Sequence, residues 1–230
     1  MSQSLEEPNR PRALAAALAA CGFATLVLLA KHPFGGAKTF AEVLQGEARD
    51  QVVAGIVHGG FIATLSVLLV CFVYLSRYLG QDRVPVVVGF VAFCIATGAT
   101  MASMIVDGFV VPAIAVRFLD VSAPDNLAAA RTLFSMCGTL IRFLMPMAMV
   151  FQGIAVLGMS LALVGQRGMA RGAAIYGICA GLMLCGAMLL APATMLEHLL
   201  LLGIVLEAFW YFAIAAAIIL TPMRGRPASL

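Results

Sequence analysis

The stretch from residue 192 to 220, PATMLEHLLLLGIVLEAFWYFAIAAAIIL, decides the fold class of this chain. It exceeds the roughly 20 apolar residues that cross the hydrocarbon core of a bilayer as a helix. It also carries three ionisable residues, Glu197, His198 and Glu207. Such residues in a membrane helix usually face the protein interior or a wet cavity, and they often have a function. The stretch therefore predicts a membrane helix that brings polar groups to a site.

The composition of the whole chain also indicates a membrane protein. The 230 residues are 63% hydrophobic and only 11% charged, with a mean hydropathy of +1.04. A soluble domain carries about 25% charged residues. The net charge of +3 is too small to indicate a nucleic-acid partner, and no basic run supports one. We expect an all-α, polytopic integral membrane protein whose surroundings are the lipid bilayer.

Six apolar segments are predicted to form one six-helix membrane domain, residues 13–221, between polar tails at 1–12 and 222–230. We expect the first segment to be retained as a helix, because its apolar run continues past the stretch that resembles a signal-peptide cleavage box. Thr39 and Glu42 fit a capping box and predict a short surface helix over 40–48. The predicted spans are 13–31, 51–77, 84–111, 131–164, 169–191 and 193–221.

Basic residues predict the orientation of the bundle. Six spans place both termini on one side of the membrane. Eight arginines lie in the two tails and in the loops on that side, against five lysines and arginines on the other. Cytoplasmic segments carry the excess of positive charge. This bias predicts cytoplasmic termini in a bacterial inner membrane, with the opposite end of the bundle facing the periplasm.

Counting about 20 residues from the cytoplasmic end of each span gives the depth of its polar residues. Glu207 lies about two to three helical turns deeper in the membrane than the polar residues at the outer boundary. His32 directly follows the first span, and we interpret it as a loop residue. The residues that reach the outer boundary are His58, Asp107, Arg142, Glu197 and His198.

A transition-metal site is the leading functional hypothesis. His58, Asp107 and His198 come from three different spans at one depth, so we expect their side chains to converge. Imidazole and carboxylate groups suit Zn or Cu, and a nearby methionine such as Met104 would favour Cu(I). Glu197 is expected to support the ligands or to replace one of them.

Three other functions fit the same residues. His58 and His198 can be axial ligands of a haem b electron carrier, with Gly55, Gly59 and Gly60 leaving room for the ring. A small-molecule or ion transporter can use Glu207 and Arg142 as a gate or relay. The chain can also be a non-catalytic subunit of a larger membrane complex.

Other features of the sequence limit the kinds of site that are expected but do not identify a reaction. Arg142 is expected to pair with Glu207 or Glu197, because an unpaired charge in the bilayer is unfavourable. The six cysteines lie in apolar stretches without a CxxC motif, which argues against a disulfide framework. The sequence contains no HExxH, Walker or GxSxG motif. It does not decide between an enzyme and a binding protein, or between a monomer and a homo-oligomer.

Overall fold

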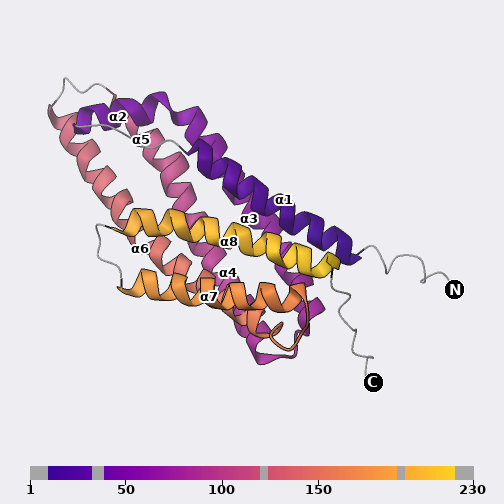
Figure 1. Cartoon of the computed structure of the whole chain (residues 1–230). Coiled ribbons are helices and arrows are strands. Elements are labelled where there is room, and N and C mark those ends of the chain that lie inside the picture. Colours follow the sequence, from indigo (N-terminus) through magenta and orange to yellow (C-terminus); the bar gives the residue numbers. More distant parts are fainter. Residues whose placement is uncertain (1–9, 33–38, 120–123, 191–194, 221–230) are drawn as a thin grey trace.

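The computed structural model describes residues 10–32, 39–119, 124–190 and 195–220, in which every regular element is a helix (Figure 1). A π-helical turn, η2, interrupts the third long helix. In chain order the elements are α1 (Arg10–Lys31), α2 (Phe40–Arg49), α3 (Gln51–Leu79), α4 (Val84–Ile105), η2 (Val106–Val110), α5 (Val111–Arg117), α6 (Pro124–Leu161), α7 (Met169–Leu190) and α8 (Leu196–Leu220).

Six helical runs are long and apolar enough to cross a membrane, which confirms the predicted all-α bundle. Two helices extend beyond the spans predicted for them. The run predicted to end at residue 111 continues through η2 and α5 to Arg117, because Pro112 falls in the first turn of α5, where proline is tolerated. Most of the span predicted at 131–164 lies within the longer helix α6, Pro124–Leu161. Of the predicted tails, only Arg10–Arg12 lie within the described residues, and they begin α1.

The start of α1 and the end of α8 lie at the same end of the bundle (Figure 1). At the opposite end α2 lies beside α5, close to where α6 begins. Long helices pack as neighbours in the pairs α1–α8, α1–α3, α3–α4, α4–α6, α6–α7 and α7–α8. The C-terminal end of α1 therefore lies close to η2 and to the start of α3, at the side of the bundle away from the start of α1 and the end of α8.

Small residues permit a close helix crossing. Where α4 meets α6, a Cβ atom added to Gly158 would lie 2.9 Å from the Cα atom of Gly89. Such contacts between small residues are a common way for membrane helices to associate. The nearby core is aromatic: the rings of Phe72 and Phe93 stack with centroids 3.5 Å apart, and Trp210 is fully buried.

The outward faces are apolar as well. On α4, Val84, Val87, Val88, Val91 and Ile95 are all exposed and recur at helical spacing. A soluble monomer rarely exposes so continuous an apolar surface. This stripe is consistent with a multi-pass protein whose helices contact lipid.

The predicted capping box at α2 is confirmed. The Glu42 backbone N–H donates to Thr39 Oγ1 at 3.3 Å, and the Thr39 N–H donates to Glu42 Oε2 at 3.0 Å. Leu44 of α2 is fully buried and packs with Ala115 of α5 and Ala130 of α6. These contacts hold α2 across the end of the bundle where the polar residues gather.

Candidate metal centre at the end of the bundle

The candidate metal centre is built around His58 on α3, which is buried, with 2% of its surface exposed. Its Nδ1 atom lies 2.8 Å from the carbonyl oxygen of Ala54, one turn earlier in the same helix. A carbonyl oxygen can only accept, so Nδ1 carries the hydrogen and donates it. This bond fixes the ring and leaves Nε2 directed away from its own helix.

The second ring nitrogen of His58 contacts Asp107: His58 Nε2 lies 3.1 Å from Asp107 Oδ2. Asp107 sits in η2, where the helix takes one wider turn. Single π-helical turns within α-helices often occur at functional sites. The next residue, Gly108, packs against the His58 side chain. The Asp107 side chain is 38% exposed, so one side of the centre is open.

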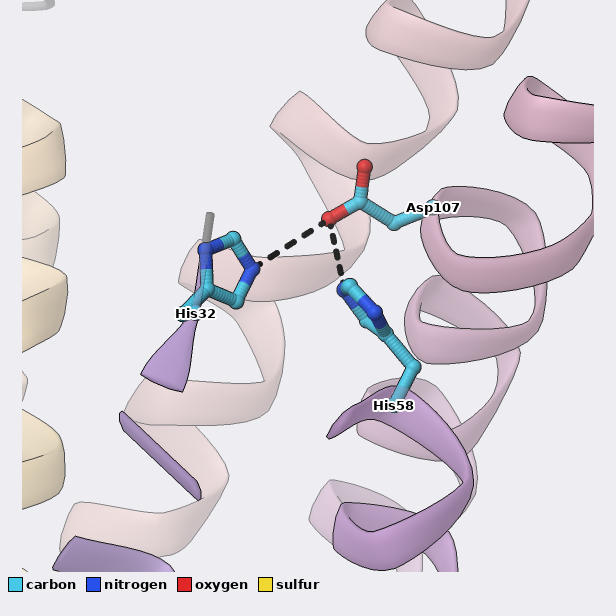
Figure 2. Close-up of side chains that lie close together, drawn as sticks. All are labelled: His32, His58 and Asp107. Atoms are coloured by element: carbon cyan, nitrogen blue, oxygen red, sulfur yellow. Dashed lines mark hydrogen bonds and ion pairs between the residues drawn. The ribbon is translucent and has the colours of Figure 1, made fainter. Parts of the chain in front are cut away.

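His32, at the end of α1, completes the group. Its Nε2 lies 3.9 Å from the same oxygen, Asp107 Oδ2. The two imidazole rings meet edge to face with centroids 5.0 Å apart. Figure 2 shows both rings directed at the one carboxylate oxygen from different helices.

One ligand atom from each of His32, His58 and Asp107 lies within 4.8 Å of the other two. Zn–N and Zn–O bonds are about 2.0–2.2 Å long, so two ligands on one ion are at most about 4.4 Å apart. Small side-chain movements would therefore let all three bind one ion. The Nδ1 bond from His58 to a backbone carbonyl is the support that metal-binding histidines usually have.

A further carboxyl group acts on the centre from α2. Burial raises the pKa of Glu47, and the negative charges of Asp107 and Asp50 raise it further, whereas His58 opposes the rise. Glu47 was not among the predicted site residues. Its only signal in the sequence is its position in the short capped helix that precedes the His58 span.

The structure brings together two of the three residues predicted to converge. His58 and Asp107 are in contact, whereas His198 is exposed on α8 and is not a member of the group. His32, interpreted from the sequence as a loop residue, takes part instead. Glu197 belongs to α8, but its side chain lies outside what the structure describes.

The arrangement around His58 does not favour the haem alternative. An added Cβ atom on Gly60 would lie 2.7 Å from Leu28 Cδ2, and one on Gly59 would lie 3.6 Å from the Phe109 ring. Side chains therefore fill the space above these glycines. The Nε2 atom that would bind iron faces Asp107, and His198 is exposed.

The predicted ion pair between Arg142 and Glu207 is not among the ion pairs of the described residues. Arg142 is exposed on α6, while Glu207 is 8% exposed inside the bundle. The Gln152 amide and the Tyr211 hydroxyl both donate to Glu207 Oε1, so the carboxyl group has hydrogen-bond donors without a cation. The alternative pair of Arg142 with Glu197 falls outside the described side chains.

Comparisons with protein-family models, with curated proteins and with solved structures found no match to this chain. We therefore infer the function of the chain from the geometry of the centre.

Proposed function

We propose that the protein binds one transition-metal ion between His32, His58 and Asp107. The observation that carries this proposal is the approach of three ligand atoms, from the end of α1, α3 and η2, to within 4.8 Å of one another. The oriented Nδ1–H bond of His58 supports it, because it directs a ring nitrogen toward the point where the ion would lie.

The ligand set indicates the class of metal. Two imidazole nitrogens and one carboxylate oxygen suit Zn or Cu better than Mg or Ca, which prefer oxygen alone. Three protein ligands leave a coordination position open, as in zinc sites that bind water or a substrate. The partial exposure of the Asp107 side chain supports an open position that faces the outer side of the bundle.

We also propose that the centre faces the periplasm of a bacterium and that both termini are cytoplasmic. The eight arginines at the other end of the helices support this orientation. A centre so placed would take its metal from the periplasmic side. The same geometry fits a binding protein or the metal-handling part of a larger membrane complex.

Metal binding by the purified protein tests the proposal. Full-length protein with a histidine-free tag, in detergent, is dialysed against Zn²⁺ or Cu²⁺, and bound metal is counted by mass spectrometry. We expect one equivalent per chain. H32Q, H58Q and D107N should each weaken binding by about 100-fold or more, since loss of only a supporting hydrogen bond already costs 10–100-fold.

H198Q is the matched control, because it removes an exposed histidine of the same outer region that lies outside the group. It should bind metal as the parent protein does. Equal metal content in H58Q and H198Q, or no bound metal in the parent protein, would rule out the proposed centre.

A further inference from the structure

A second polar site lies deeper in the bundle. A cavity of about 50 Å³ is bounded by α1, α3, α4, α6 and α8. One water needs roughly 10–15 Å³ of such volume, so the cavity has room for about three. Threonines line it from three helices, at Thr25, Thr64 and Thr100, and Glu207 lines it from α8.

The cavity begins one helical turn below the metal centre. Phe61 lies three residues after His58, and Met104 lies three residues before Asp107; both line the cavity. Three residues of helix correspond to about 4.5 Å. Phe61 and Met104 pack with Val57 and Met145 in one apolar cluster. This cluster separates the outer centre from the cavity.

Among the described residues that line the cavity, Glu207 is the one with a carboxyl group. Within the described part of the chain, no lysine, arginine or histidine forms an ion pair with it. The titratable group in contact with it is Tyr211, and the next titratable side chains near Tyr211 are Cys21 and Cys71. A carboxylate buried in apolar surroundings without a cation is strongly disfavoured, so the neutral acid is the stable form.

The hydrogen bonds of Glu207 fit the neutral acid. Gln152 and Tyr211 both donate to Oε1, which is the pattern expected at a carbonyl oxygen. No described residue donates to Oε2. A proton on Oε2 can therefore be donated to water in the cavity. The side chains of Thr64 and Thr100 donate to the carbonyl oxygens of Gly60 and Ala96, which leaves their oxygens able to accept from the same water.

We propose that Glu207 and this cavity form a proton-binding site inside the membrane, distinct from the metal centre. The Oε2–H bond breaks when a cavity water takes the proton, and it re-forms when a proton returns from the same water. Such a group can carry protons in a coupled transport step. The site needs no metal ion and does not depend on the metal proposal.

Infrared spectroscopy of the metal-free, full-length protein tests this inference. We expect a carbonyl band of a protonated carboxylic acid at neutral pH that is lost in E207Q. E47Q, which changes a carboxyl group outside the cavity, should keep the band. Y211F should move the band to higher frequency, because it removes one donor from the Oε1 carbonyl. Transfer to D₂O should shift the parent band within minutes, since the acid exchanges its proton with water.

Two results would overturn the inference. A parent spectrum without a protonated carboxyl band assignable to Glu207 would show that the carboxylate is ionised. A band that does not shift after hours in D₂O would show a sealed structural acid. Where E207Q does not fold, the shift of the band in Y211F assigns it to Glu207, and both results are then read from the parent protein.

Discussion

Replacing Gly108 with alanine is expected to destroy the metal centre while leaving all three ligands in the sequence. An added Cβ atom would overlap the Cβ and Cγ atoms of His58 and lie 2.8 Å from its Nδ1. These atoms are at the base of the side chain and cannot swing away alone. Either η2 separates from α3, or His58 rotates and loses its bond to Ala54.

We expect G108A to lower metal affinity as strongly as D107N does. It should also lower the apparent melting temperature in detergent, since overpacking typically costs about 1–3 kcal/mol. The control is G98A on α4, where nothing lies within 4 Å of an added Cβ atom. Alanine in place of glycine within a helix is neutral or slightly stabilising when there is space. Parent-like metal binding by G108A would contradict the contact between η2 and α3.

Replacing Gly177 with alanine is expected to destabilise the opposite half of the bundle without touching the metal centre. An added Cβ atom would overlap Ser160 Oγ and Trp210 Nε1 and lie 2.7 Å from Trp210 Cδ1. Trp210 is fully buried, and its Nε1–H donates to Ser160 Oγ at 3.0 Å. The indole must move and lose this bond.

Overpacking of about 1–3 kcal/mol and a lost hydrogen bond of about 1 kcal/mol should both contribute to the loss of stability in G177A. Thermal unfolding in detergent measures the effect, and G172A is the control on the same helix, because an added Cβ atom there meets nothing. Metal affinity in G177A should equal that of the parent protein below its melting temperature. A parent-like melting curve for G177A would show that α6, α7 and α8 are packed less tightly than described.

The sequence predicts how far along a helix a residue lies better than it predicts the direction in which its side chain points. His58, Asp107 and His198 were all expected near one level, but adjacent residues of a helix differ by about 100° in direction. In α8 apolar residues surround the helix, so their periodicity does not show which face is internal. His198 was therefore included among the predicted ligands without evidence that it faces inward, whereas His32 was interpreted as a loop residue.

Two other features escape sequence reasoning for local reasons. Apolar composition does not reveal the π-helical turn that brings Asp107 and Gly108 to His58. The expected pairing of Arg142 with Glu207 followed from charge alone, whereas neutral donors from Gln152 and Tyr211 satisfy the carboxyl group. In contrast, the long spans and the Thr39–Glu42 capping box depend on local composition, and the structure confirms them.

The most direct test of the proposed metal centre is the position of a bound metal ion. Crystals of the full-length protein loaded with Zn²⁺ would be measured at the zinc absorption edge to obtain an anomalous difference map. We expect one peak about 2.0–2.2 Å from a nitrogen of His32, a nitrogen of His58 and an oxygen of Asp107. A peak at His198 or at a cysteine, with the hydrogen bond between His58 and Asp107 intact and no density between them, would contradict it.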